Sequence, residues 1–194
     1  NNLKQIALAL HNYHDAFGQF PEAVIPGSAN TPEASLSWQA AILPFLEQVA
    51  EYNQLNLQQG WQSPANRQVT RSVLSIYQNP GISLPKIEGS GATHYVGWAG
   101  LGPEGPTRPV TDPKAGVFAY NRGTRLRDIA DGTSNTVMTS EATAESVGPW
   151  AAGGRPTLRP LTARPYINGP DGIGGPYRGG LHVGMAGGSL RFVN

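Results

Sequence analysis

Two histidines and one aspartate near the start of the chain have the spacing that metal ligands use on a helix. His11 and His14 are three residues apart, and Asp15 follows directly. Imidazoles at positions i and i+3 share one helix face and can hold a metal ion, with a carboxylate oxygen as a further ligand. The structural alternative places His14 half-buried beside Phe17 and His11 in solvent. We prefer this alternative because the sequence offers no further ligand, and a metal-assisted hydrolase ranks third among the functions considered.

A second group of oxygen-bearing side chains lies in residues 128–135, which read Asp-Ile-Ala-Asp-Gly-Thr-Ser-Asn. The segment lacks the alternating ligands and the terminal Glu of a calcium loop. We interpret it as a turn in which Asp131 forms an Asx-type bond to the backbone and Gly132 adopts a positive φ. Ser134 and Asn135 would then tie the turn to the strand that follows. Calcium binding near Asp131 is the alternative.

Other candidates for catalysis carry less support. Ser134 and Ser140 have no histidine nearby and no strand-turn-helix elbow, which argues against a hydrolase triad. His94 shares a strand face with Trp98, and we expect a packed, hydrogen-bonded histidine there rather than a base. The sequence therefore predicts no catalytic residue, no cofactor site and no metal ligand, and the protein is not expected to be an enzyme.

Binding features are also present. The glycine-rich residues 172–175 and 179–180 lack the lysine and the flanking strand and helix of a phosphate loop. Aromatic side chains stack on sugar rings, but tryptophans also anchor protein cores, and one sequence does not separate the two roles. Four residues form the candidate sugar platform: Trp98, Trp150, Tyr166 and Tyr177.

The first element that positions these residues is a helix over residues 1–18. Its apolar side chains recur at helical spacing and include Leu3, Ile6, Ala7, Leu10, Tyr13, His14 and Phe17. Gly18 suits the C′ position of a helix, and Pro21 prevents a restart. No capping signal precedes the apolar stripe, so we expect the rear half of a longer helix that continues upstream.

Residues 35–77 are predicted to form short helices. Pro44 divides an apolar stretch into one helix before it and another that begins at it, because the first turn of a helix tolerates its missing N–H. Residues 66–77 are predicted to form a third helix, which ends at the Asn79-Pro80-Gly81 turn.

The period of the apolar pattern then changes from 3.6 to 2, which predicts a sheet within residues 91–194. The expected strands are 93–98, 116–120, 136–141 and 189–193. A long excursion over residues 147–180, with Trp150 and Tyr166 as its anchors, is typical of a binding or interface loop. Helices followed by strands indicate an α+β fold in one domain, 1–194, with an antiparallel sheet packed on the N-terminal helix.

The composition excludes several classes of protein. The chain has no cysteine, and therefore no disulfide, thiolate metal site or cysteine nucleophile. Its net charge of +1 provides no field that would attract nucleic acid or an acidic membrane. Charged residues make up 14%, against about 25% in ordinary domains. With 25 Gly and 17 Pro, this low charge indicates a loop-rich, exported protein rather than a cytoplasmic enzyme.

Three stretches together resemble one bacterial family. They are residues 1–15 (NNLKQI…LHNYHD), 36–48 (LSW…LPFLEQ) and 131–141 (DGTSNT…E). They are similar to signatures of a large group of pilin-like exported proteins of unknown function. Members of this group carry a prepilin-type N-terminal methylation signal and a C-terminal motif in which His is followed ten residues later by Asp-Gly.

The resemblance implies a type IV pilin or pseudopilin architecture. It implies a non-enzymatic structural subunit of a pilus or secretion-type pseudopilus, displayed in the cell envelope. A hydrophobic helix upstream of Asn1 would anchor the subunit in the cytoplasmic membrane before assembly and would contact other pilin-like subunits. The alternative function is an envelope module that binds a glycan or solute through the 147–180 excursion.

The chain departs from the family pattern at two places. Aligning residues 186–192 on the C-terminal motif puts Gly187 at its Asp position and Tyr177 at its His position, and His182 is too close to Gly187 to replace that His. Many relatives also have Cys-Pro where this chain has Asn79-Pro80. The site or disulfide that these residues form in relatives is therefore not expected here.

Overall fold

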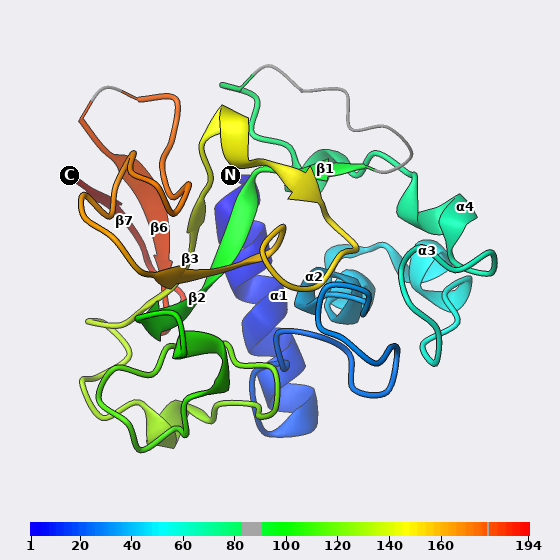
Figure 1. The fold of residues 1–194 in the computed structure, drawn as a ribbon, viewed down its shortest axis with the longest axis horizontal. Helices are drawn as coiled ribbons and strands as arrows, with labels where there is room; N and C mark the ends of the chain where they lie inside the picture. The colour runs from blue at the N-terminus through cyan, green and yellow to red at the C-terminus, as the bar shows by residue number, and fades with distance from the viewer. Residues whose placement is uncertain (83–90, 178) are drawn as a thin grey trace.

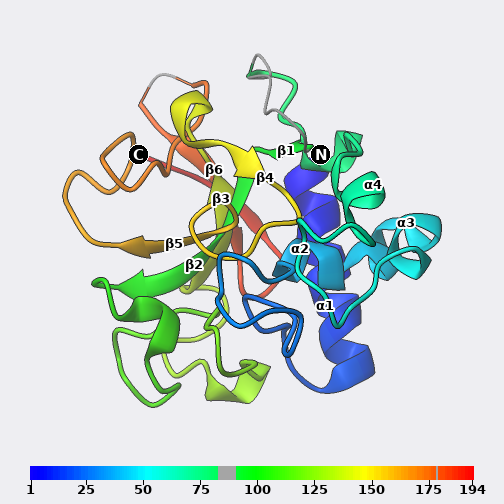
Figure 2. The same cartoon turned by 45° about the vertical axis from the view of Figure 1, so that its right-hand side comes forward.

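The architecture was obtained as a computed structural model that describes residues 1–82, 91–177 and 179–194. The helix α1 (Asn2–Phe17) lies between two layers, with the β-strands on one side and the short helices of residues 38–70 on the other (Figures 1 and 2). This arrangement is α+β, as predicted. The first short helices are α2 (Trp38–Ala41), η1 (Leu43–Leu46), α3 (Val49–Asn53), α4 (Arg67–Thr70) and η2 (Ser75–Tyr77), where η denotes a 3-10 helix. The later ones are η3 (Gly105–Thr107), η4 (Leu126–Asp128) and η5 (Ala144–Ser146).

Helix α1 buries one stripe and ends where the sequence predicts. Leu3, Ile6 and Leu10 are buried, and Gly18 caps the helix in the left-handed conformation with φ 75°. Phe17, which was expected to be buried, is 62% exposed and contacts Tyr13. The buried stripe ends before Phe17, whose ring lies beside those of Tyr13 and Phe45 rather than in the core.

The short helices follow the prediction around Pro44 and depart from it further on. Pro44 lies in the first turn of η1, directly after α2, as expected. The helix predicted over residues 66–77 is wrong, because it is broken into α4 and η2. The carbonyl oxygen of Thr70 accepts the Gly91 N–H, and that of Ser72 accepts the Trp150 indole N–H. These tertiary hydrogen bonds replace the i→i+4 bonds that a continuous helix would need.

The main sheet has five strands in the order β5-β2-β3-β6-β7. Its members are β2 (Tyr95–Leu101), β3 (Val137–Glu141), β5 (Leu158–Leu161), β6 (Leu181–Met185) and β7 (Leu190–Val193), and β1 (Ala92–Thr93) pairs separately with β4 (Gly148–Pro149). Strand β5 runs parallel to β2, whereas the other neighbours are antiparallel. The expectation of a purely antiparallel sheet is therefore wrong.

The predicted strand over residues 116–120 is also wrong. Residues 117–119 are all buried, without the alternation of a half-buried strand. An isolated bridge joins Ala115 to Gly100, and the N–H groups of Gly116 and Phe118 donate to carbonyl oxygens of β2, without the regular pairing of a strand. The ring of Phe118 packs 4.9 Å from that of Trp38, and a Cβ at Gly97 would lie 2.7 Å from the Phe118 ring. The segment thus fills the core as an irregular stretch beside β2 rather than as a regular strand of the sheet.

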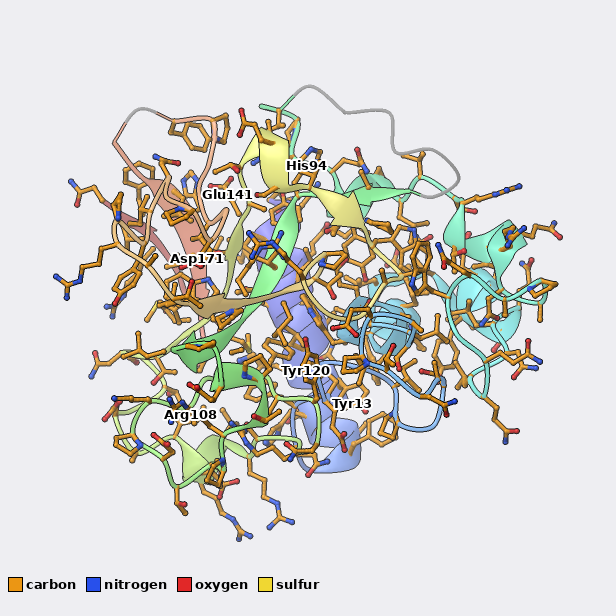
Figure 3. All side chains as sticks on the ribbon, viewed as in Figure 1. Tyr13, His94, Arg108, Tyr120, Glu141 and Asp171 are labelled. Carbon is orange, nitrogen blue, oxygen red and sulfur yellow. The ribbon has the colours of Figure 1, made fainter. Side chains whose placement is uncertain are left out.

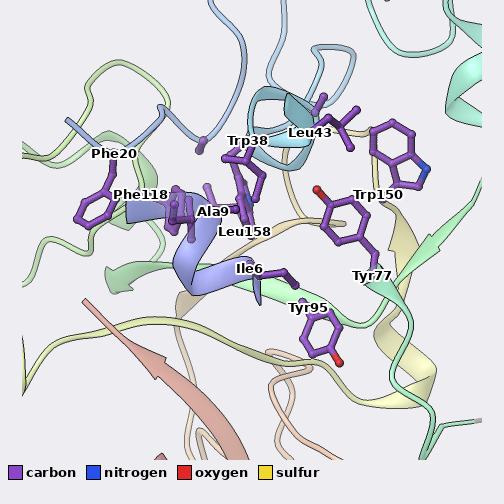
Figure 4. Close-up of a cluster of buried hydrophobic side chains, with 14 of the residues drawn as sticks. Ile6, Ala9, Phe20, Trp38, Leu43, Tyr77, Tyr95, Phe118, Trp150 and Leu158 are labelled. Atoms are coloured by element: carbon purple, nitrogen blue, oxygen red, sulfur yellow. The ribbon is translucent and has the colours of Figure 1, made fainter. Parts of the chain in front are cut away.

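Two hydrophobic clusters occupy the two faces of the sheet. The larger joins α1, the short helices and the inner face of the sheet around Leu10, Trp38 and Trp150 (Figure 4). The smaller contains Leu161, Ile173, Leu181 and other residues of the outer face. Alternation along β2 explains the division, because Tyr95 belongs to the larger cluster and Val96 to the smaller.

Apart from residue 178, which lies outside the described residues, the 147–180 excursion is built into the fold. It contains β4 and β5 and covers the outer face of the sheet with Tyr166 and Ile173. The carboxylate of Asp171 accepts hydrogen bonds from the backbone N–H groups of Thr162 and Ala163. Trp150 is a fully buried anchor, as expected.

Candidate functional site

The histidine motif at the end of α1 faces the segment that contains the Asp131 turn. The Nε2 atom of His14 accepts the backbone N–H of Leu126 at 3.2 Å, and its Nδ1 lies 3.9 Å from the Asp15 carboxylate. The ring also packs on Phe20, with 5.0 Å between centroids. His14 therefore joins the C-terminal turn of α1 to η4.

His11 does not face solvent, contrary to the expectation. Its Nε2 is buried without a hydrogen-bond partner among the described residues, and its ring packs edge-on against Phe20. A Cβ at Gly188, in the turn between β6 and β7, would lie 3.2 Å from Nε2, and Gly188 has a φ of 83°. Burial lowers the pKa of His11, and a hydrogen bond with the backbone of Ala186 partly opposes this shift. The sequence placed both residues on a helix but did not show that the β6–β7 turn closes over His11.

This geometry leaves few free ligand atoms for a metal ion at His11 and His14. The Nε2 lone pair of His14 is occupied by Leu126, and Nε2 of His11 points toward the Gly188 turn. Within residues 1–82, 91–177 and 179–194, no group of three or more His, Asp or Glu side chains is placed to hold a metal ion.

The Asp131 turn is formed differently from the prediction. Gly132 has a positive φ of 85°, as expected, but no Asx-type bond from the exposed Asp131 side chain is found in the described part of the chain. The side chain of Asn135 instead donates to the carbonyl oxygen of Asp131 at 3.1 Å. The backbone N–H of Gly187 donates to the carbonyl oxygen of Thr133 at 3.0 Å. Gly187, which stands at the Asp position of the family's C-terminal motif, therefore contacts this turn.

We expect Asn135→Ala to destabilise the protein by about 0.5–1.5 kcal/mol, the usual net contribution of one hydrogen bond. Asp131→Ala is the matched control and should change stability by less than about 0.5 kcal/mol, because its side chain is exposed. Thermal unfolding of both variants, with and without calcium, tests this. A larger loss for Asp131→Ala, or stabilisation of the wild type by calcium, would contradict the assignment.

Glu141 forms a buried polar network that the sequence reasoning missed. The residue is 4% exposed, and Oε1 accepts a hydrogen bond from the Asn79 side-chain amide at 2.7 Å. Oε2 accepts the His182 backbone N–H at 2.7 Å and lies 3.4 Å from His182 Nδ1. One carboxylate thus joins β3, β6 and the segment after η2. The sequence did contain a sign of this network. Glu141 is the last residue of the third signature stretch, and Asn79 stands where many relatives have the Cys of Cys-Pro.

His94 lies beside this network, in the upper part of Figure 3 near Glu141. It is fully buried, and its Nδ1 accepts the backbone N–H of Asn79 at 3.0 Å. The acceptor role of Nδ1 puts the proton of the neutral ring on Nε2, which has no partner among the described residues. Burial lowers the pKa of His94, although a hydrogen bond with the backbone of Tyr77 partly opposes this. The expectation of a packed, hydrogen-bonded histidine is confirmed.

We expect the protein to lose stability as the pH falls below about 6.5. Burial lowers the folded-state pKa of both His94 and His11 from 6.5, so the unfolded chain binds more protons in the window below that value. Their contribution is present above pH 6.5 and is lost as the pH falls through the folded-state pKa. His94→Asn keeps an acceptor for the Asn79 N–H but does not titrate, so its melting temperature should fall less between pH 7 and 5. Equal pH slopes would contradict this assignment.

The predicted sugar platform is not assembled as one surface. Trp150 is fully buried in the larger cluster, whereas Trp98 and Tyr166 pack on the smaller one. Tyr177 instead meets His182 and Phe192, with ring centroids 5.0 and 6.2 Å away. The rings of Tyr177, His182 and Phe192 form a partly exposed cluster, in which His182 lies on β6 and Phe192 on β7. The sequence analysis did not predict this cluster.

The other candidates have structural roles. Ser140 accepts the Trp98 indole N–H at 2.8 Å and donates to the Glu141 carbonyl oxygen. Ser134 is exposed, and no side-chain hydrogen bond of it is found in the described residues, so its expected tie to the strand is not observed. Gly172 and Gly174 pack closely on Ser146 and Asn168 and contribute to the cover of the sheet.

Comparison with known proteins gives one match. A family described as protein of unknown function (DUF1559) matches residues 1–159, which include all three signature stretches but not the C-terminal motif. No curated protein and no solved structure matches the chain. Within the described residues, no helix is long and apolar enough to cross a membrane. Because the family match spans most of the chain, the protein belongs to the DUF1559 family of proteins of unknown function.

Proposed function

We propose that this chain is the globular domain of a non-enzymatic, pilin-like structural subunit displayed in the cell envelope. The observation that carries the proposal is the position of α1, a 16-residue helix packed along β3 and β6 on one side and η1 on the other. Because α1 is packed on both sides, it should move as one rigid body with the domain. A segment attached to its first turn would therefore fix the orientation of the whole domain. In this proposal, an apolar extension of α1 anchors the subunit in the cytoplasmic membrane and packs with other pilin-like subunits during assembly.

The exposed side of α1 also supports assembly. Leu8 is 61% exposed and borders a groove of about 650 Å³ that η1 and η2 also line. Single exposed apolar residues are ordinary on protein surfaces. Here the residue lies in the first half of α1, where neighbouring subunits would approach if the helix continued into a bundle.

The test extends α1 by an apolar helix of about 20 residues, enough to span a bilayer. Membrane fractionation, light scattering and electron microscopy compare the extended chain with the chain alone. We expect the extended chain to partition into membranes and form filaments, and the chain alone to stay dispersed. A matched control places Pro-Gly at the junction, which keeps the apolar segment but interrupts the helix.

Three outcomes separate the possibilities. Filaments from the extended chain that the Pro-Gly control fails to form support a subunit built on a continuous helix. Filaments from the chain alone would place the assembly contacts within these 194 residues. Dispersed extended chain after insertion would contradict the structural-subunit proposal.

One observation favours the alternative, an envelope module that binds glycans. The partly exposed rings of Tyr177 and Phe192 lie on the same surface as His182, and aromatic faces stack on sugars. Oligosaccharide binding that is lost in Phe192→Ala, without loss of folding, would favour this function over assembly.

A further inference from the structure

A second concave site lies at the C-terminal end of α1, and it is lined in part by residues of the first two signature stretches. It is a pocket of about 360 Å³ between the last turn of α1, residues 19–26, η1 and α3. This volume is within the range of about 300–1,000 Å³ that is typical of small-molecule sites. Most of its lining is apolar, and three of the lining residues are prolines, which lose little entropy when a ligand orders the wall.

Aromatic rings form much of the wall. Tyr13, Phe17, Phe45 and Tyr52 all line the pocket. The ring of Phe45 is nearly perpendicular to those of Tyr13 and Phe17, with interplanar angles of 71° and 89° and centroids 5.9 and 6.4 Å apart. The rings of Tyr13 and Phe17 lie 4.5 Å apart at 45°, so the three rings form one packed aromatic wall of the pocket. Phe17 is 62% exposed, so a large apolar side chain is kept at the mouth of the pocket.

The one charged group in the lining is a carboxylate. Glu22 is partly buried, and no hydrogen bond or ion pair of its carboxylate is found within the described residues. Burial raises the pKa of Glu22, which means that the site holds the charge at a cost in stability. Burial also raises the pKa of Tyr13, with smaller contributions from Tyr52 and from Glu22 itself. Tyr13, Tyr52 and Glu22 all line the same pocket.

These features select one class of ligand. An anion would meet the Glu22 charge and no cation in the lining. A cation with apolar substituents gains from ring faces through cation–π attraction and from the carboxylate at once. We propose that this pocket binds a free, substituted ammonium solute about the size of choline, held by the aromatic rings and by Glu22.

The first experiment measures binding of choline to the intact chain by calorimetry and by chemical shifts of the Tyr13 and Phe45 rings. The neutral carbon isostere 3,3-dimethylbutan-1-ol is the matched ligand control, because it has the same shape without the charge. We expect choline to bind with a dissociation constant on the order of 1 mM and the isostere about tenfold more weakly. Equal affinity for both ligands, or no saturable choline binding at ~10 mM, would overturn the proposal.

The second experiment uses variants that should fold. Glu22→Gln and Phe17→Ala should each weaken choline binding about two- to fivefold, the effect expected of one exposed cation contact. Glu145→Gln and Leu8→Ala remove an exposed carboxylate and an exposed apolar side chain outside the pocket and should leave affinity unchanged.

A stability readout separates a binding role from a structural one. Because burial raises the pKa of Glu22, Glu22→Gln should slightly raise the melting temperature at pH 7 while it weakens binding. Loss of both stability and binding would mean that Glu22 supports the fold instead. Competition by phosphatidylcholine vesicles at equal headgroup concentration would assign the pocket to a lipid and overturn the free-solute proposal.

Discussion

Replacing Leu10 by alanine is expected to cost about 2–5 kcal/mol of unfolding free energy, as large-to-small changes in well-packed cores do. Leu10 is fully buried in the larger cluster, at the centre of a helix with neighbours on two sides. Neither layer can collapse into the space without moving α1, so the cavity should persist.

The matched control is Leu8→Ala on the same helix. Leu8 is 61% exposed, and its loss should change stability by less than about 0.5 kcal/mol. Alanine also has a slightly higher helix propensity than leucine, so the control does not weaken the helix itself. Urea unfolding gives both values from the midpoint at constant m. If Leu10→Ala matched the control, α1 would not lie between the two layers.

Replacing Glu141 by alanine should cost about 2–5 kcal/mol for a different reason. The change leaves the buried Asn79 amide and the His182 N–H without an acceptor, and each unsatisfied group costs about 1–3 kcal/mol. Glu145→Ala, which removes an exposed carboxylate four residues further on, should be nearly neutral.

A double-mutant cycle with Asn79→Ala isolates the network. Contacting residues of one hydrogen-bond network usually couple by about 0.5–3 kcal/mol, whereas separate sites add. We expect Glu141→Ala and Asn79→Ala to be clearly less than additive, because each already removes the 2.7 Å bond between them. Strict additivity, or a Glu141→Ala cost equal to that of Glu145→Ala, would mean that Glu141 does not join these segments.

The candidate site shows the limit of reasoning from sequence. His14 and the Asp131 turn were singled out from local patterns, and the structure places them on connected segments through Leu126. The partner of Glu141 was not identified, since Asn79 is 62 residues away along the chain. No spacing rule connects positions so far apart. The hydrogen bonds of Tyr77 and Asn79 to His94, together with the pairing of β2 with β3, bring them together.

Local physical rules determined a large part of this fold from the sequence alone. The period of α1, the positive φ of Gly18 and the division of the short helices at Pro44 were all predicted, as were the strands β2, β3 and β7. Each depends on residues within about one or two turns of one another, where side-chain period and backbone sterics decide the conformation.

The tertiary structure decided the features that depend on distant partners. Leu181, Val183 and Met185 alternate as the residues of a strand do, but the many glycines around them kept β6 from being predicted. In the structure, β6 pairs with β3 and β7. Strand β5 contains Pro160, which is tolerated because β5 lies at the edge of the sheet beside β2. Val117 and Phe118 have strand-forming side chains, yet Phe118 packs on Trp38 and the segment does not form a regular strand. In each case the free energy of long-range pairing and burial decided the conformation, and a local pattern does not contain that energy.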